Sequence, residues 1–196
     1  MFEYQAQNFE HLLGLPGMSD ALLTNHITLY QGYVTNVNKL IGLLDTMEFS
    51  TPEYAELQRR FGWEWNGMRL HELYFGNLQK ETVLEPTGTI KEKIEQVYGS
   101  VENWKKNFEN LGTMRGIGWV ALVHDTQSGE LFNIWINEHD LGILAGSTVL
   151  LIMDVFEHAY MLDYGIKRAD YLSVFMNAID WTAVEKRYLD SQNRNS

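Results

Sequence analysis

The stretch Val149-Leu150-Leu151-Ile152-Met153-Asp154-Val155-Phe156-Glu157-His158-Ala159-Tyr160 decides how the C-terminal half of this chain folds. Its first five residues are all apolar, which is typical of a buried β-strand. The strand ends at Asp154, and His158 follows four residues later, so a carboxylate and an imidazole can point at one place. Both groups are common ligands of first-row metals. The stretch therefore predicts half of a metal site, and Glu157 is placed to hydrogen-bond an imidazole.

Two further β-rich runs precede this strand, at residues 119–124 and 131–137. The sequence between them, Asp125-Thr126-Gln127-Ser128-Gly129, is typical of a hairpin turn. We therefore expect a three-stranded antiparallel sheet. After it, helices are expected from about residue 171 and over about 181–189, and the tail 191–196 is expected to be disordered.

The first half of the chain has helical periodicity. Ser19 or Asp20 can cap a helix over about 21–47, and Thr51-Pro52-Glu53 opens a second over about 52–78. Two long neighbouring helices predict a helical hairpin. Shorter helices are expected at about 89–98 and 101–111, after the linker sequence Leu84-Glu85-Pro86-Thr87-Gly88.

The predicted fold class is therefore α+β, with an N-terminal helical hairpin followed by a mixed domain of three antiparallel strands and surrounding helices. We expect a hairpin domain over residues 1–86 and an α+β domain over residues 87–196, with the metal site between them.

Composition excludes several kinds of site. The 196 residues contain no cysteine, so a metal here must be held by His, Asp or Glu. A formal net charge of −11 argues against nucleic acid as a partner, and means that an anionic substrate needs local positive charge. No apolar run is long enough for a membrane span, and the first residues do not resemble a secretory signal, so we expect no membrane partner and a cytoplasmic location.

Two more histidines lie on predicted helix faces beside tyrosines. His26, Tyr30 and Tyr33 are spaced i, i+4 and i+7, and His71 stands three residues before Tyr74. If the hairpin closes, His26 and His71 can meet Asp154 and His158. The alternative is that each histidine is a core residue, but a buried carboxylate without a charged partner is costly. The joint pattern therefore favours a four-ligand site.

These residues resemble the iron/manganese superoxide dismutase family over nearly the whole chain. Residues 154–160 are similar to the family signature Asp-x-Trp-Glu-His-Ala-(Tyr/Phe), and residues 67–75 to its second-helix segment with a metal-binding His. Further segments match in the same order, at residues 99–105, 116–119, 169–171 and 177–181.

The resemblance implies dismutation of superoxide to oxygen and hydrogen peroxide at one Fe or Mn ion per chain. The implied ligands are His26, His71, Asp154 and His158, with water or hydroxide as a fifth. The choice between Fe and Mn cannot be read from these ligands, because the same set serves both.

Other roles follow from the same resemblance. Tyr33 is the expected gateway phenol and Trp119 a wall of the active site. Glu157 is expected to bridge to the partner subunit's His158 in a homodimer. Substrate steering would need local cations, for which Lys167 and Arg168 are the candidates; a solvated surface role is the alternative for this pair.

The first ligand departs from the family pattern. Family members carry a His eight residues before the gateway tyrosine, where this chain has Asn25, and His26 lies seven before Tyr33. A π-bulge can add one residue to a helix. We therefore expect a regular helix without a bulge, which keeps His26 directed at the metal.

Other departures affect the gateway, the interface and the residue that bonds the metal's solvent ligand. Phe156 stands where the family motif has Trp, and Met161 stands where an interface Tyr is usual. Leu29 or Tyr30 takes the place of a gateway His, and Gly67 the place of a Gln. His139, in Asn137-Glu138-His139-Asp140, is the predicted replacement for the solvent-bonding residue, and the alternative is that it is a structural histidine of the loop.

Two alternatives stay open at this point. One is a catalytically silent metal-binding homodimer of the same fold. The other is a non-haem iron oxygenase, which would use two His and one carboxylate, leave one candidate His unliganded and need an organic substrate pocket.

Overall fold

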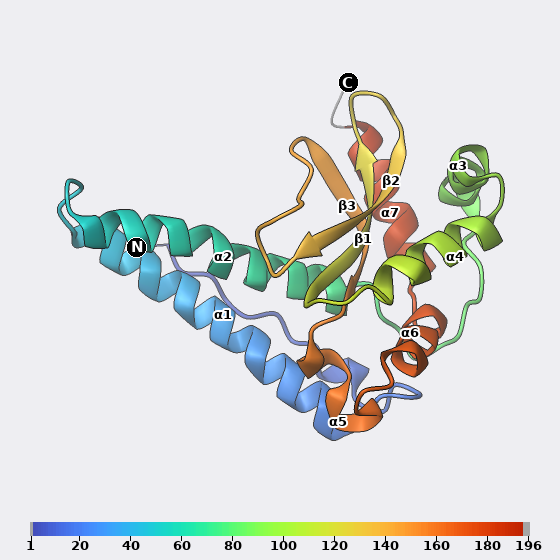
Figure 1. Cartoon of the computed structure of the whole chain (residues 1–196), viewed down its shortest axis with the longest axis horizontal. Helices are drawn as coiled ribbons and strands as arrows, with labels where there is room; N and C mark the ends of the chain where they lie inside the picture. The colour runs from blue at the N-terminus through green and yellow to red at the C-terminus, as the bar shows by residue number, and fades with distance from the viewer. Residues whose placement is uncertain (1, 194–196) are drawn as a thin grey trace.

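Two long antiparallel helices form one arm of the molecule, α1 (Asp20–Thr46) and α2 (Pro52–Phe75). Residues 2–193 are described by the computed structural model, and the arm extends away from the sheet (Figure 1). Ser19 and Thr51 cap the two helices, because their side chains accept hydrogen bonds from the amides of Leu22 and Tyr54. The predicted hairpin is confirmed, although α2 ends three residues earlier than expected.

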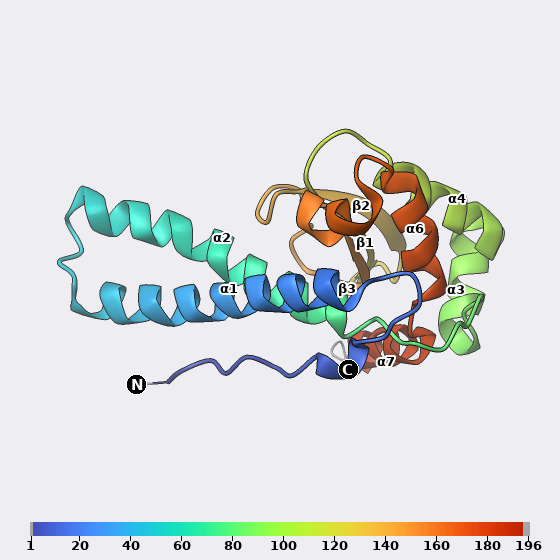
Figure 2. The same cartoon turned by 90° about the horizontal axis from the view of Figure 1, so that it is seen from below.

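The first helix is a regular α-helix along its whole length, with no π segment. Its buried residues recur at helical spacing and form the face that meets α2 and the rest of the core: Leu22, Leu23, His26, Ile27, Tyr30, Tyr33, Val34, Val37, Leu40. The segment before it runs back along the hairpin (Figure 2). There the backbone N–H and C=O of Tyr4 both bond to the Asn38 side chain at 2.8 Å.

The sheet consists of β1 (Gly118–Asp125), β2 (Leu131–Asn137) and β3 (Ser147–Asp154). Their order is β2-β1-β3, and β1 pairs antiparallel with both neighbours, which confirms the expected sheet. The central strand is buried from Gly118 to His124 because it is covered on both faces. In its register with β3, Trp119 lies opposite Asp154, the last residue of that strand.

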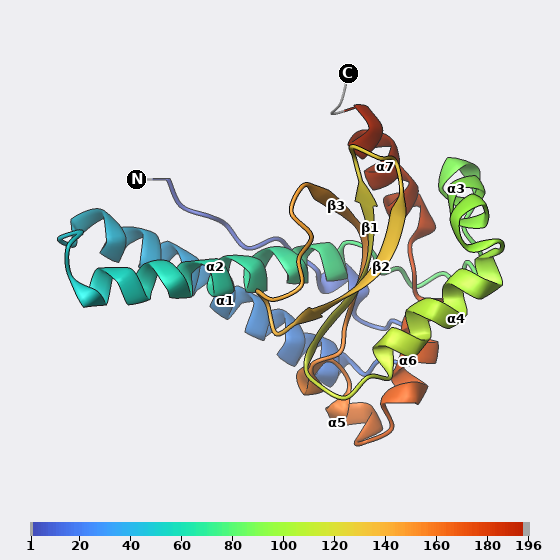
Figure 3. The same cartoon turned by 45° about the horizontal axis from the view of Figure 1, so that its top comes forward.

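Shorter helices surround the sheet. The helices α3 (Gly88–Tyr98) and α4 (Val101–Gly112) lie on one side of it (Figure 3), where α4 packs on β1 and β2. The long helix α2 and α7 (Trp181–Gln192) pack on β3. Between β3 and α7 come η2 (Glu157–Ala159), α5 (Met161–Tyr164) and α6 (Arg168–Asn177), and a short turn, η1 (Glu10–Leu12), precedes α1.

Some boundaries differ from the sequence-based expectation. The prediction of a disordered tail from residue 191 is wrong for residues 191–192, because α7 continues to Gln192 and buries Ser191. Residues 194–196 of that predicted tail lie outside the described residues. The turns η1, η2 and α5 were not expected, since three or four residues carry too little periodicity to reveal a helix. No helix within residues 2–193 is both long and apolar enough to cross a bilayer.

Candidate metal centre

Four side chains from four different elements meet where α1, α2, β3 and η2 come together. They are His26 on α1, His71 on α2, Asp154 at the end of β3 and His158 in η2. Their nearest ligand atoms all lie within 4.8 Å of one another. The sequence-predicted set is therefore brought to one place, from positions more than a hundred residues apart along the chain.

The spacings within this cluster suit the ligands of a single ion. The Nε2 atoms of His158, His26 and His71 lie 3.1, 3.2 and 3.6 Å from Oδ2 of Asp154. Nitrogen and oxygen ligands of a first-row metal stand at about 2.1 Å from the ion, so two ligands of one ion are about 3 to 4.2 Å apart. The three contacts to Asp154 fall in that range.

His71 supplies an independent test of the fit. Its Nδ1 lies 2.5 Å from the carbonyl oxygen of Gly67, which can only accept, so Nδ1 carries the proton. Nε2 is then a bare acceptor. It is fully buried, has no hydrogen-bond partner among the described residues, and faces the Asp154 carboxylate, which is also an acceptor. A cation between the two groups satisfies both, so the residues present fit a metal ion.

Electrostatics support the same conclusion. Asp154 has 0% exposure, and no Lys or Arg side chain is paired with it in residues 2–193. Burial by itself raises the pKa of this carboxyl group, but the charge of His158 and the hydrogen bonds of His158 and His26 outweigh it and hold the pKa below its usual range. Burial lowers the pKa of His26 and of His71, so these imidazoles stay neutral and able to ligate.

The structure distinguishes His26 from Asn25. His26 is 2% exposed and points at Asp154, whereas Asn25 is exposed to solvent. Because α1 contains no π segment, a histidine seven residues before Tyr33 reaches the cluster. The expectation of a regular helix is thus confirmed.

His139 and Tyr33 lie beside the cluster. Nε2 of His139 is 2.8 Å from the Tyr33 hydroxyl oxygen, and the Trp119 indole N–H donates to Nδ1 at 3.1 Å. The ring of Tyr33 lies 5.1 Å from that of His71. All three residues nominated from the sequence therefore adjoin the candidate ligands. Burial lowers the pKa of His139 to about 4, so it is neutral near pH 7.

Several residues at this site were missed by sequence reasoning. The ring of Trp63 lies 4.5 Å from that of His139, and Asn66 donates from Nδ2 to the His139 carbonyl at 2.7 Å. Phe156 was noted only as a departure, yet it stacks on both His139 and His158, at 4.8 and 5.1 Å. Trp63 lies eight residues before His71 on α2, so helical spacing was the available signal for it, whereas the five-residue spacing of Asn66 gave no such signal.

Comparison with known proteins agrees with this geometry. The profile of "Iron/manganese superoxide dismutases, C-terminal domain" matches residues 86–187. The chain is 37% identical to "Superoxide dismutase [Mn] 2" of Haloferax volcanii over 178 residues, 88% of each chain. It is 36% identical to "Superoxide dismutase [Fe]" of Cupriavidus metallidurans, covering 89% of this chain and 90% of the other. This chain belongs to the iron/manganese superoxide dismutase family.

Within this superoxide dismutase family, relatives named for manganese and for iron are similarly close to this chain. The second-helix position that often carries Gln is Gly67 here. A Cβ atom at Gly67 would lie 2.5 Å from Cδ1 of Tyr33, so the tyrosine ring occupies the space of a larger side chain. The polar group that faces Tyr33 comes instead from His139.

The gateway of this superoxide dismutase also differs from the family pattern. Tyr30 is fully buried, and its hydroxyl donates to Glu72 at 3.0 Å. Leu29 is 36% exposed and lines a small surface hollow together with Tyr33. Leu29, one of the two residues at the place of the missing gateway His, therefore lies on the surface beside Tyr33.

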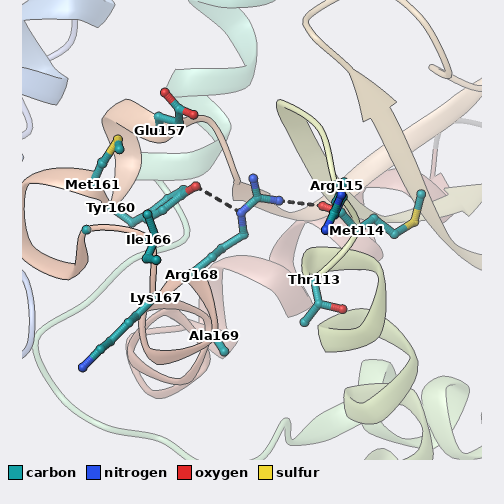
Figure 4. Close-up of a pocket in the computed structure, with 11 residues that line it drawn as sticks. Thr113, Met114, Arg115, Glu157, Tyr160, Met161, Ile166, Lys167, Arg168 and Ala169 are labelled. Carbon is teal, nitrogen blue, oxygen red and sulfur yellow. Dashed lines mark hydrogen bonds between the residues drawn. The ribbon is translucent and has the colours of Figure 1, made fainter.

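A second hollow, of about 390 Å³, contains the residues proposed for the dimer bridge and for steering (Figure 4). Glu157 lies at its rim, exposed, and Lys167 points away from it. The Arg168 guanidinium donates to the carbonyls of Met114 and Gly116, at 2.7 and 2.8 Å. These bonds join α6 to the connection between α4 and β1.

Proposed function

We propose that the chain binds one Fe or Mn ion through His26, His71, Asp154 and His158, and uses it to dismutate superoxide. Family membership assigns the reaction, in which two superoxide anions and two protons give one O₂ and one H₂O₂. The observation that carries the proposal for the site is the bare Nε2 of His71, buried and directed at a carboxylate.

When bound, such an ion supplies the one-electron steps that oxidise one superoxide and reduce the next. The chain's own residues hold the site in place. His71 is oriented by its bond to Gly67, and Asp154 by the amide of Phe156, which donates to Oδ1 at 2.8 Å. The Tyr171 hydroxyl donates to the backbone carbonyl of Asp154 at 2.7 Å, so both the side chain and the backbone of this residue are held by hydrogen bonds.

Protons are the second requirement of the reaction. Burial raises the pKa of Tyr33, so its hydroxyl stays protonated at neutral pH. His139 donates from Nε2 to the Tyr33 oxygen, because Nδ1 is occupied by the Trp119 N–H. The Tyr33 O–H is then free to donate toward the hollow, where an incoming anion can accept it. We assign Tyr33 the proton-donor role, with His139 and Trp119 setting its direction.

Assembly and location are further parts of the proposal. Glu157 is exposed and adjacent to His158, which supports the expected bridge to the partner subunit's His158 in a homodimer. The cytoplasmic location, the absence of nucleic-acid and membrane partners, and the domain boundary at residues 86 and 87 stay predictions. The oxygenase alternative is not supported, because it leaves one histidine free, whereas all three Nε2 atoms face Asp154.

The test is metal analysis paired with a superoxide assay on each reconstituted form. The purified wild type should hold about one Fe or Mn per chain and consume superoxide. His71→Ala and Asp154→Ala should lose both properties, while His11→Ala, at an exposed histidine, should keep both. Metal retained in full by either ligand variant would refute the ligand assignment. A loaded wild type without activity would identify the catalytically silent alternative.

A further inference from the structure

The surface hollow in front of Tyr33 contains one cation. The hollow has a volume of about 230 Å³ and is lined by Leu29, Gly32, Tyr33, Asn36, Arg60, Trp63 and Glu64. Tyr33 forms the link to the site, because its hydroxyl bonds to His139 and its ring contacts His71. Arg60 is the only Lys or Arg among these lining residues.

The Arg60 guanidinium is held by two neighbours on the same helix. Its Cζ lies 3.8 Å from the ring centroid of Trp63. Its Nε and Nη2 atoms lie 2.8 and 2.6 Å from Oε1 of Glu64. Stacking and ion pairing together restrict a side chain that would otherwise move freely, so the charge stays at the edge of the hollow.

The two members of this ion pair differ in exposure. The Glu64 side chain is 5% exposed, and Asn36 donates to its other oxygen at 3.2 Å. The Arg60 side chain is 44% exposed. Within residues 2–193, Nη1 of Arg60 has no hydrogen-bond partner. An anion in solution therefore meets the guanidinium first, while the carboxylate lies behind it.

We propose that Arg60 is the residue that attracts superoxide into the hollow in front of Tyr33, with Trp63 and Glu64 as its positioning residues. This rests on the proposed function, because it concerns the substrate of the same site. The chain has a net charge of −11, so an anionic substrate needs a local cation at the entrance. Arg60 lines the hollow in front of Tyr33, whereas Lys167 and Arg168 line the other hollow and Arg168 is bonded to backbone carbonyls.

The first experiment measures superoxide consumption by the metal-loaded enzyme at ionic strengths from about 0.01 M to about 1 M, over which the Debye length falls from about 30 to about 3 Å. At low salt Arg60→Gln should be about 3- to 10-fold slower than wild type, and the two should converge at high salt. Arg59→Gln is the control, since Arg59 also forms an ion pair within α2, with Glu56, but does not line the hollow.

Variants at Glu64 extend this test and guard against instability of Arg60→Gln, which leaves a buried carboxylate unpaired. At low salt Glu64→Gln should be the fastest, followed by the wild type and then by the double variant Arg60→Gln/Glu64→Gln. Arg60→Gln should be the slowest. The proposal is overturned if Arg60→Gln, loaded with metal, matches the wild type, if its loss is equal at all ionic strengths, or if Arg59→Gln shows the same loss.

A second experiment uses the metal-free protein and needs no activity. Iodide, an anion, and acrylamide, a neutral molecule, both quench tryptophan fluorescence. The fluorescence of Trp63 is obtained by subtracting the fluorescence of a Trp63→Phe variant from that of the protein with Trp63. The ratio of iodide to acrylamide quenching should fall about 2-fold or more in Arg60→Gln and stay constant in Arg59→Gln. An unchanged ratio in Arg60→Gln would show that Arg60 attracts no anion. If instead the loaded wild type consumes no superoxide, the proposed function fails, and the iodide result still decides the role of Arg60.

Discussion

The indole N–H of Trp119 donates to Nδ1 of His139, and this one contact fixes which nitrogen of His139 carries its proton. An indole can only donate, so Nδ1 must accept. In the neutral imidazole the proton is then on Nε2, which lies 2.8 Å from the Tyr33 hydroxyl oxygen. A residue of the sheet thereby controls the direction of a hydrogen bond on α1.

Replacing Trp119 with Phe should therefore release this control while leaving the candidate ligands in place. We expect metal content to be retained, activity to fall about 10-fold, and stability to fall by about 1–3 kcal/mol, because Nδ1 becomes a buried acceptor without a donor. Nitrogen-15 NMR of the metal-free protein should show His139 protonated on Nε2 in the wild type and a tautomer mixture in the variant. Trp181→Phe is the control, since the buried indole N–H of Trp181 has no partner among the described residues. A wild-type His139 protonated on Nδ1 would contradict the assignment.

The register of α1 gives a second prediction. His26→Ala should weaken metal binding by at least about 100-fold, whereas Asn25→Ala should bind metal like the wild type, because Asn25 is exposed. Metal affinity measured by competition with a chelator distinguishes the two. The exchange variant Asn25→His/His26→Asn should not recover binding, since residue 25 is exposed to solvent and about 100° around α1 from residue 26. Recovery in that variant would mean that α1 can shift its register.

Gly67 is predicted to tolerate no side chain. In Gly67→Ala the new Cβ would overlap the Tyr33 ring at 2.5 Å, so the ring must move and its bond to His139 must lengthen. We expect a loss of about 1–3 kcal/mol in unfolding free energy and a reduced activity at full metal content. Gly62→Ala on the same helix meets open space and should be neutral or stabilising by up to about 1 kcal/mol. Equal stabilities for the two variants in urea denaturation would disprove the packing argument.

Stability of the metal-free protein should fall in acid. Burial lowers the pKa of His139 to about 4 from an ordinary value of about 6.5. Between these values the unfolded chain binds a proton that the folded chain does not, so the free energy of unfolding decreases as pH falls. His139 accounts for up to about 3 kcal/mol of this loss, and the lowered pKa values of His26 and His71 act in the same direction.

The variant His139→Gln isolates this effect. Urea denaturation from about pH 7.5 to about pH 4.5 should give a slope that is smaller than the wild-type slope by up to about 1.4 kcal/mol per pH unit. His11→Gln, at an exposed histidine, is the control and should keep the wild-type slope. An identical slope in His139→Gln would mean that the folded protein takes up the proton at this histidine as readily as the unfolded chain does.

Much of the fold could be predicted because its signals are local. Ser19 and Thr51 begin helices where capping residues were expected, and the apolar run that ends at Asp154 is a strand. The expected ligand set also meets in one cluster, since His26 and His71 occupy buried faces that periodicity identifies. The predictions that failed also concerned local features. The three-residue turns and the end of α7 depend on a few contacts that leave no periodic pattern in the sequence.

The sequence by itself determined the longer helices, the strands, the family and the residue types that can hold a metal, because capping, periodicity and the motif around Asp154 depend on neighbouring residues. Only the tertiary structure decided that Asn25 is exposed, that Arg168 is bonded to backbone carbonyls and that Arg60 stands in front of Tyr33. Each of these depends on how helices pack against the sheet. A side chain's face is set by its own helix, but its partner is set by residues distant along the chain.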